Sequence, residues 1–432
     1  MALSVGKLGF VMKRVERIRL YPTTRQATRL QFALDITREL FNALLEERRD
    51  AWRRRRISIS AKQQYAEITA LRSHGQRLDG RMSAVYRECE DAVLHRLDLA
   101  MRASFRRIRL GEKPGFPRFK PRSRWHQLEF PHGSRALIFD SMQKRVKIPK
   151  IGLVRLRKGR RIPECFGRAW VVERNDRWYL CVEHEIRVKP KRATTHIVGI
   201  DRGVHVLAAT SNGDLIKNLA VGEKRKVAVG RLQREVDSRT KKDAAGRCIN
   251  RKDPSRIASV KRFARAKEHE ANARRDYAHK KSRHIVDNFD CIGLESLNLR
   301  RMTRSARGTA ARPGRSIRAK SSLNRVLLDA GFGLLRQMIE SKAEEAGVTI
   351  VTVDARFSSQ TCSRCGNCER GNRRRRRFRC LRCGFATHAD INAALEIRRR
   401  AELKLLSSEP HPAEEAGRSA FARGVGSHNE AR

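Results

Sequence analysis

Four cysteines in the carboxyl-terminal part of the sequence have the spacing of a metal site. They form two C-x-x-C pairs separated by fourteen residues, and a glycine follows each pair, at Gly366 and Gly384. A tight turn at such a glycine lets backbone amides face the sulfurs, and four thiolates in this arrangement match a structural, tetrahedral zinc site. The predicted Zn²⁺ ligands are Cys362, Cys365, Cys380 and Cys383. Cys368 is a spare at the same spacing that could substitute, but it lies outside the glycine-backed pairs and is left out of the set.

Three carboxylates occupy positions where a second kind of metal chemistry is possible. Asp201 ends the apolar run VGI, Glu295 ends the apolar run CIGL, and Asp390 opens a helix whose next residues are mostly apolar. Two divalent ions held by carboxylates clamp the attacking and leaving oxygens in phosphodiester cleavage, and Mg²⁺ prefers such oxygen ligands. Each acid alone also has a structural interpretation. Asp201 could accept a local hydrogen bond, Glu295 could face water at a strand end, and Asp390 could interact with the helix dipole. The three together, in a very basic protein, favour a catalytic magnesium site.

Other candidates for this chemistry are weaker. Asp354 follows the strand-like run VTIVTV, but the turn there already needs a polar residue to end the strand. His279, His284 and His388 could be ligands or acid–base groups. They have no paired spacing with the cysteines, so we interpret them as surface or nucleic-acid contacts.

Charge indicates the kind of partner. The sequence has 97 Lys and Arg against 46 Asp and Glu, a net charge of +51. Such a surplus favours a polyanion, because each phosphate that is neutralised releases counterions. Composition alone leaves a membrane surface or a ribosome open as well. No apolar stretch of about eighteen residues occurs, and the charges near the first residues follow the apolar run rather than precede it, unlike a secretory signal. We therefore expect a cytoplasmic, nucleoid-associated protein.

The elements that must position these groups can be outlined from periodicity. A strand is predicted at 13–20, a long helical region at 24–110, and a boundary loop at GEKPGFPRFKPRSR, which has three prolines and two glycines. Short strands follow over 127–188, with a hairpin turn at Asn175-Asp176. The five scattered cysteines are predicted to be small buried hydrophobes. They are Cys89, Cys165, Cys181, Cys248 and Cys291.

From residue 197 on, the order is hairpin, helical insertion, strand, helix, strand, zinc insertion and helix. This order predicts an RNase H-like core, a mixed sheet flanked by helices. The segment SLNRVLLDAGFGLLRQMIESKAEEAG predicts one amphipathic helix that ends at Gly347. The last 25 or so residues are predicted to be disordered.

The motifs resemble a known family. IVGIDRGVHVLAATSNG, CIGLESLNL and HADINAALEI resemble the three RuvC nuclease motifs of the TnpB family, transposon-encoded RNA-guided DNA endonucleases of the OrfB type that are related to type V CRISPR effectors. SSQTCSRCG with FRCLRCG resembles that family's zinc-containing target-nucleic-acid-binding insert. RIRLYPTTRQ with FNALLEERRDAW resembles its amino-terminal helix-turn-helix segment, and GFPRFK, IPKIGLVRLR and DYAHKKSRHIVDNFD follow in the expected order. The resemblance covers roughly residues 13 to 400.

The resemblance implies an α+β multidomain architecture, in which a RuvC nuclease core with a zinc ribbon insert accompanies a helical recognition lobe and a wedge-type β-barrel. The implied boundaries are 13–23 for the first wedge strand, 24–110 for the helical recognition domain, 111–192 for the rest of the wedge barrel, 195–357 for the RuvC core with its helical insertion, 358–386 for the zinc ribbon, 387–405 for the final RuvC helix and 406–432 for a disordered tail.

The resemblance also implies a function. Asp201, Glu295 and Asp390 would act with magnesium, an RNA from the transposon end would guide a monomer, and the protein would read a short motif beside a double-stranded DNA target. A guide-RNA-dependent DNA-binding repressor without cleavage is the alternative, although such relatives are expected to lose an acid and here all three remain. A third possibility is a transposase that joins DNA strands itself. It is disfavoured, because nothing in the sequence supplies a separate end-binding and joining apparatus. Two features depart from the family: Glu396 stands where Asn is common, and residues 300–322 are rich in Arg and Ala.

Overall fold

The computed structural model describes residues 11–74, 81–140, 142, 144–159, 162–203, 206–219, 223–308, 312–329 and 331–407. These residues divide into two compact units, 11–187 and 188–407, each with its own sheet. None of the helices in these ranges is long and apolar enough to cross a bilayer. From residue 408 on, the tail that was predicted to be disordered lies outside the described residues.

The unit 11–187 is built on a seven-stranded antiparallel sheet of order β2-β6-β7-β1-β5-β4-β3. Its hairpin turn is confirmed: Asn175 and Asp176 have φ values of 52° and 58°, as a two-residue turn between twisted strands requires. No ladder joins β2 to β3 among the described residues, so the segment predicted as a wedge-type β-barrel forms an open sheet. The strands are β1 Val11–Tyr21, β2 Gln127–Phe130, β3 Ile138–Phe139, β4 Arg145–Ile148, β5 Gly152–Leu156, β6 Ala169–Arg174 and β7 Arg177–Arg187.

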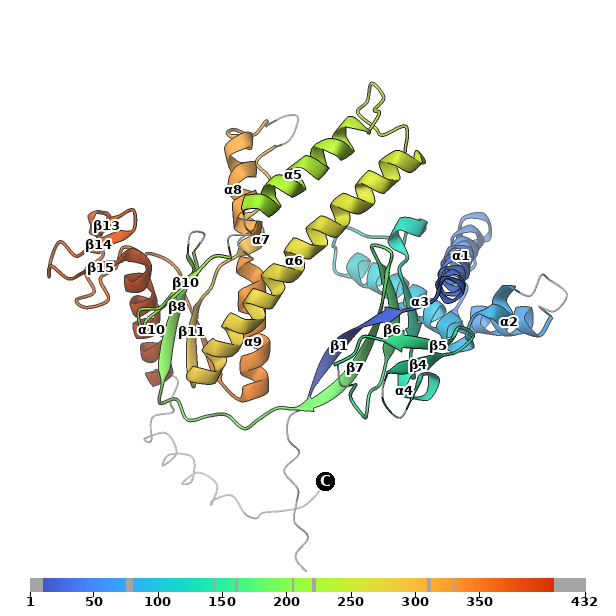
Figure 1. Cartoon of the computed structure of the whole chain (residues 1–432), viewed down its shortest axis with the longest axis horizontal. Coiled ribbons are helices and arrows are strands. Elements are labelled where there is room, and N and C mark those ends of the chain that lie inside the picture. Colours follow the sequence, from blue (N-terminus) through green and yellow to red (C-terminus); the bar gives the residue numbers. More distant parts are fainter. Residues whose placement is uncertain are drawn as a thin grey trace, which may run out of the picture. The chain divides into compact units, whose positions relative to one another are not determined.

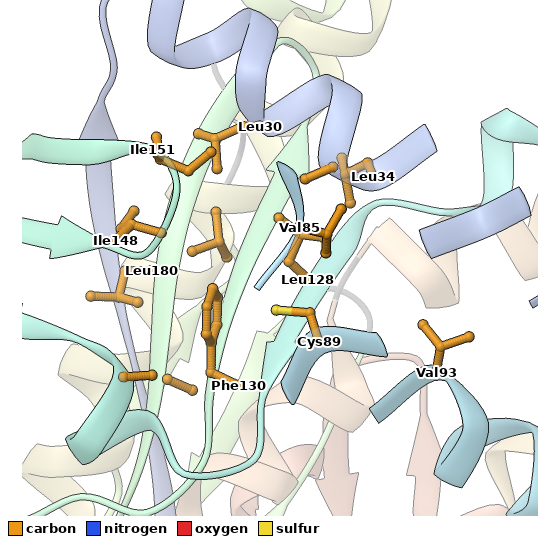
Figure 2. Close-up of a cluster of buried hydrophobic side chains, with 14 of the residues drawn as sticks. Leu30, Leu34, Val85, Cys89, Val93, Leu128, Phe130, Ile148, Ile151 and Leu180 are labelled. Atoms are coloured by element: carbon orange, nitrogen blue, oxygen red, sulfur yellow. The ribbon is translucent and has the colours of Figure 1, made fainter. Parts of the chain in front are cut away.

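The predicted helical region of this unit is confirmed as three helices, α1 Thr24–Arg55, α2 Ala61–His74 and α3 Arg87–Arg109. Thr23 caps α1 and exchanges two hydrogen bonds with Gln26, which satisfies backbone donors at the helix start. Figure 2 shows Leu30 and Leu34 of α1 in the same apolar cluster as Cys89 of α3 and Phe130 of β2. The short elements of the unit are η1 Arg81–Ala84, η2 Arg122–Arg124 and α4 Gly133–Ala136.

The unit 188–407 contains a five-stranded sheet of order β10-β9-β8-β11-β12. Strands β8, β9 and β10 form an antiparallel meander, whereas β8, β11 and β12 are parallel neighbours. Counted along the chain, the order is 3-2-1-4-5, which confirms the predicted RNase H-like core. The strands are β8 Ile197–Asp201, β9 Val206–Thr210, β10 Leu215–Lys217, β11 Cys291–Glu295 and β12 Thr349–Val353.

Helices cover both faces of this sheet (Figure 1). On one face, Val198 and Ile200 pack in a cluster with Ile285 of α6 and Leu335 of α9. On the other face lies α10, whose Ile397 packs with apolar side chains of β11 and β12. The helices are α5 Glu223–Ser238, α6 Pro254–Asn288, α7 Leu299–Met302, α8 Ile317–Asp329, α9 Phe332–Ala346 and α10 Ala389–Leu406.

The prediction of one long helix before β12 is wrong. α8 begins before the predicted start and ends at Asp329, and α9 begins at Phe332. Gly331, with φ of 68°, lies between them in the left-handed region, a conformation that ends an α-helix rather than continuing it. α9 does end at Gly347, as predicted, with φ of 70°.

Two glycines let α10 lie directly across the sheet. Gly199 of β8 and Gly293 of β11 are register partners in the parallel ladder. A Cβ atom at Gly199 would collide with the Ala394 carbonyl oxygen, and one at Gly293 would come within 3.0 Å of the Ala401 Cβ atom. The close approach therefore depends on the absence of side chains at both positions.

The scattered cysteines are not all buried, contrary to the prediction. Cys89 and Cys291 are buried, with 3% and 0% of their surface exposed, but Cys165 is exposed. Cys181 and Cys248 are intermediate. Burial thus explains two of the five cysteines fully.

Candidate functional site

Asp201 and Glu295 lie side by side at the carboxyl ends of adjacent parallel strands. Asp201 comes two residues after Gly199, and Glu295 comes two residues after Gly293; these are the two glycines across which α10 lies. Because alternate residues of a strand share a face, both carboxyl groups point to the face that α10 covers. The two side chains are hydrogen-bonded to each other, and Glu295 is only 5% exposed.

Burial and mutual repulsion dominate the electrostatics of this acid pair. Burial, together with the charges of Glu295 and Asp390, raises the pKa of Asp201 to about 8. Burial also raises the pKa of Glu295, although Arg202 opposes the shift. Two close carboxylates cannot both ionise cheaply in a buried place, so they share a proton. The oxygen donors and their mutual repulsion fit a divalent cation of the Mg²⁺ type.

Three other side chains fix Glu295. Its carbonyl oxygen accepts hydrogen bonds from Arg202 Nη2 at 3.1 Å and from Arg336 Nη1 at 2.8 Å. Ser358 Oγ, in a residue only 4% exposed, donates to Glu295 Oε1 at 3.3 Å. The sequence pattern did not indicate a role for these three residues. The only signal for Ser358 was its place in the motif SSQTCSRCG, next to the first cysteine pair.

Asp390 lies in the first turn of α10, as predicted, and its surroundings differ from those of the other two acids. Its backbone N–H donates to His388 Nδ1, which caps the helix, and its Oδ1 accepts from Arg373 Nη2 at 3.1 Å. Asp390 is close enough to raise the pKa of Asp201. In the described part of the chain, however, only the four cysteines form a group of potential ligand atoms that all lie within 4.8 Å of one another. The structure thus pairs two of the acids and places the third nearby, in an ion pair.

The weaker candidates take structural positions. The Asp354 side chain is 67% exposed, and its Oδ1 accepts from the backbone N–H of Arg356 at 3.0 Å, as a residue that ends a strand does. His284 on α6 contacts Asn288, and His388 caps α10. Among the described residues, no histidine belongs to a group close enough to hold an ion.

The four predicted cysteines come together. Their Sγ atoms all lie within 4.8 Å of one another, with 3.7 Å between Cys362 and Cys383 and 3.5 Å between Cys365 and Cys380. The predicted glycine turns are confirmed, because Gly366 and Gly384 have φ values of 74° and 73°. Cys368 is exposed and lies outside the cluster.

Backbone amides prepare the sulfurs for metal. The N–H groups of Cys383 and Arg382 point to the Cys380 sulfur and lower the pKa of that thiol to about 6. Burial raises the pKa of Cys362 to about 12, against the opposing effect of the equivalent amides of Cys365 and Arg364. Metal binding requires thiolates, and the paired N–H donors stabilise them, so the donor set fits zinc.

The cysteine ribbon is fastened to α10 close to Asp390. Its three-stranded sheet consists of β13 Arg373–Arg374, β14 Arg377–Arg379 and β15 Ala386–His388, with η3 Arg370–Asn372 before it. The fully buried Asn392 of α10 accepts from Ser363 N and Oγ, both at 3.1 Å, and donates to the Thr361 carbonyl oxygen at 2.8 Å. Asn392, which the sequence analysis missed, therefore joins the first cysteine turn to the helix that carries the third acid.

A Cys362→Ser variant is expected to lose its bound zinc, because three thiolates and a hydroxyl hold zinc far more weakly than four thiolates. Elemental analysis of dialysed protein measures the loss, and amide hydrogen exchange should rise over 361–386. Cys368→Ser is the matched control, since that thiol lies outside the cluster. Unchanged zinc content in Cys362→Ser would refute the ligand assignment.

Glu396, the departure from the family pattern, is fully buried and doubly ion-paired. Its carboxylate accepts from Arg399 and Arg400, with the closest contact at 2.8 Å in each case. Arg400 Nη1 in turn donates to the carbonyl oxygens of Asp354 and Arg356 at 2.8 and 2.9 Å. The glutamate thus ties α10 to the turn after β12 and takes the place of no proposed metal ligand.

An RNase H-like sheet with a four-cysteine ribbon inserted before its last helix defines a RuvC-type fold. Three family models match the chain: "Helix-turn-helix domain" of the OrfB type over residues 12–56, "Probable transposase" of the OrfB type over 179–306, and "Cas12f1-like, TNB domain" over 332–397. The chain is therefore similar to OrfB-type transposases over 12–56 and 179–306 and to the Cas12f1-like domain over 332–397. Over 12–56 the structure has the strand β1 followed by the single helix α1.

Three curated proteins are similar to the chain. The chain is 31% identical to "Putative RNA-guided DNA endonuclease InsQ" of Escherichia coli over 253 residues, which span 58% of this chain and 60% of that protein. It is 26% identical over 392 residues, 89% of each chain, to a "Putative RNA-guided DNA endonuclease" of Streptomyces pristinaespiralis. It is 30% identical over 235 residues, 52% of this chain and 50% of the other, to the CRISPR-associated endodeoxyribonuclease Cas12f1 of Sulfoacidibacillus thermotolerans.

Solved structures give weak superpositions. A Cas12f1–sgRNA–target DNA complex matches 90% of this chain and 99% of that chain at 16% identity and a TM-score of 0.30. CasPhi-2 bound to crRNA matches 90% and 98% at 11% identity and a TM-score of 0.39. The similarity to known proteins is therefore argued from the sequence matches alone.

Proposed function

We propose that the protein is an RNA-guided DNA endonuclease. One observation carries the proposal: Asp201 and Glu295 are hydrogen-bonded at the ends of adjacent parallel strands, under the helix whose first turn holds Asp390. Buried, mutually repelling acids at one edge of a sheet are typical of catalytic metal sites. The names of the relatives from Escherichia coli and Streptomyces pristinaespiralis support the same activity.

The chain's own residues have separable roles in this proposal. Asp201, Glu295 and Asp390 would hold magnesium, which when bound stabilises the attacking and leaving oxygens of a phosphodiester. Arg202 and Arg336 hold the main chain of Glu295. Ser358 donates to Oε1 of the Glu295 carboxylate and so orients that group.

The proposed partners are an RNA from the transposon end and a double-stranded DNA target. A net charge of +51 suits a protein that holds two nucleic acids. In this division of labour, base pairing with the guide reads most of the target, and the protein reads a short flanking motif. Four-thiolate zinc in the ribbon would be structural, since it leaves no open coordination position.

A second function, guided DNA binding without cleavage, is favoured by one observation. Asp390 is held by Arg373, and the three carboxylates do not form a compact group of ligand atoms. If the ion pair between Arg373 and Asp390 always persists, Asp390 cannot bind metal and the protein would act as a repressor. If the ion pair opens when metal and DNA bind, the protein would act as a nuclease.

Sequencing the RNA that copurifies with the protein tests the proposal and supplies its reagents. We expect one RNA species with a constant part and a variable end. Duplex DNA that matches the variable end, with randomised flanking bases, should be cut when magnesium is added and survive in EDTA. Cleavage that needs no RNA would contradict guidance. RNA-dependent DNA binding with no cleavage at any magnesium concentration would support the repressor instead.

A further inference from the structure

The GFPRFK loop, residues 115–120, lines a pocket that the proposed chemistry does not use. The loop lies against α1 and α3 within the unit 11–187, around a pocket of about 370 Å³. This volume is within the usual range of small-ligand sites. Apart from Phe41, all lining residues lie outside the three ranges that match the family models.

The pocket is cationic without any acid in its lining. Five basic side chains surround it, and among the described residues none of them has an ion-pair partner. They are Arg96, Arg107, Arg118, Lys120 and Arg124. The Arg96 guanidinium lies 4.6 Å from the Trp125 ring centroid, and burial lowers its pKa against the opposing charge of Glu129, which lies outside the lining. Five cations with no ion pair among the described residues and no acid in the lining prepare the pocket for a negatively charged ligand.

Aromatic rings stand beside these cations. Phe116 and Phe119 are 46% and 41% exposed, although large apolar rings are normally covered. Arg49 lies over the Phe119 ring at 4.6 Å, whereas no ring or cation of the described residues lies over Phe116. Exposed rings next to unpaired guanidinium groups are the composition of sites that stack unpaired bases.

The loop is held in place before any ligand binds. Asn42 of α1 donates Nδ2 to the Lys120 carbonyl oxygen at 3.1 Å and accepts from the Lys120 N–H at 2.7 Å. Gly115 leaves room for the Arg107 guanidinium, with which a Cβ atom would collide. A pocket held in this way loses less entropy on binding than a mobile loop does.

We propose that this pocket binds one unpaired nucleotide of a single strand, with the base on Phe116 and its phosphates on Arg107 and Arg118. A free phosphate would use the cations but leave the rings exposed, and the base of an intact duplex is already stacked on its neighbours. The inference rests on the proposed function for the presence of nucleic acid. The strand is either guide RNA or a separated DNA strand.

Photocrosslinking to the full-length protein tests the proposal, with oligouridine and oligothymidine strands that carry 5-iodouracil as probes. We expect mass spectrometry to place the crosslink at Phe116. Phe116→Ala should remove this crosslink and weaken binding on the order of tenfold, and Phe116→Trp should restore binding. Crosslinking of oligouridine alone would identify guide RNA as the ligand. Equal crosslinking of oligouridine and oligothymidine would show that the pocket accepts a single strand of either RNA or DNA.

Two matched controls separate the pocket from general basic binding. Phe105→Ala removes a ring of α3 that is 51% exposed and outside the pocket, and Arg106→Gln removes a charge next to Arg107 but outside the lining. Both should crosslink like the unaltered protein, whereas Arg107→Gln should weaken binding. Equal behaviour of Phe116→Ala and Phe105→Ala would overturn the inference, even if guided cleavage is demonstrated. Failure of cleavage with an intact crosslink at Phe116 would count against the proposed function and leave the pocket standing.

Discussion

An Asp201→Asn variant is expected to cut guided DNA at least about a thousandfold more slowly, because metal stabilisation contributes several kcal/mol to such reactions. Asparagine keeps the size of the side chain and a hydrogen bond to Glu295 but removes the charge that would hold a cation. RNA binding should be unchanged, since the residue lies at the end of a buried strand. Single-turnover cleavage and RNA filter binding measure the two effects separately.

Asp354→Asn is the matched control for Asp201→Asn. It makes the same chemical change at the end of β12, the other parallel neighbour of β11, on a side chain that is 67% exposed. It retains the oxygen that accepts from Arg356 and should cut at the normal rate. Normal cleavage by Asp201→Asn would eliminate the proposed nuclease site.

A Gly199→Val variant should lose cleavage without any change in an acid. The new side chain meets the Ala394 carbonyl oxygen and the Arg398 N–H of α10, neither of which can move without the helix. We expect α10 to shift and to carry Asp390 away from Asp201. Overpacking of this kind costs about 1–3 kcal/mol, which corresponds to a melting temperature roughly 2–12 °C lower. Cleavage assays and thermal unfolding give the measurement.

The milder Gly199→Ala and the control Gly230→Ala show whether the effect is local. A Cβ atom at Gly230 of α5 meets nothing within 4 Å, so this variant should keep full activity and stability, or gain slightly from higher helix propensity. Gly199→Ala should retain zinc and RNA while it loses most cleavage, which would distinguish a displaced helix from an unfolded chain. Full activity of Gly199→Val would show that α10 does not need the glycine groove.

Local chemistry explains which features could be predicted from the sequence. The turn at Asn175-Asp176 and the glycines after the cysteine pairs depend on a few adjacent residues, so their sequence signals are direct. The paired patterns GID and GLE place an acid two residues after a glycine in each of two strands. Strand alternation then puts both acids on one face, and parallel pairing puts them at one edge.

Contacts between distant residues could not be predicted in this way. The bonds of Asn392 to Thr361 and Ser363, and the ion pair between Arg373 and Asp390, join positions far apart in the sequence. Periodicity describes which face of an element is buried, not which partner it meets. Whether the sheet closes into a barrel could not be predicted for a similar reason, because alternation within strands is the same in an open and a closed sheet. The break at Gly331 was missed because apolar spacing continues through it.

The attachment of the ribbon to α10 divides the three acids between two mechanical supports. Asp201 and Glu295 lie at the ends of sheet strands, whereas Asp390 is paired with Arg373 of the ribbon and lies on α10, which Asn392 joins to the ribbon. A shortage of zinc is therefore expected to displace Asp390 in the proposed nuclease site while leaving the buried pair of acids intact. The same linkage would couple binding to the acid site: a nucleic-acid strand that moves the ribbon would also move α10 and, with it, Asp390.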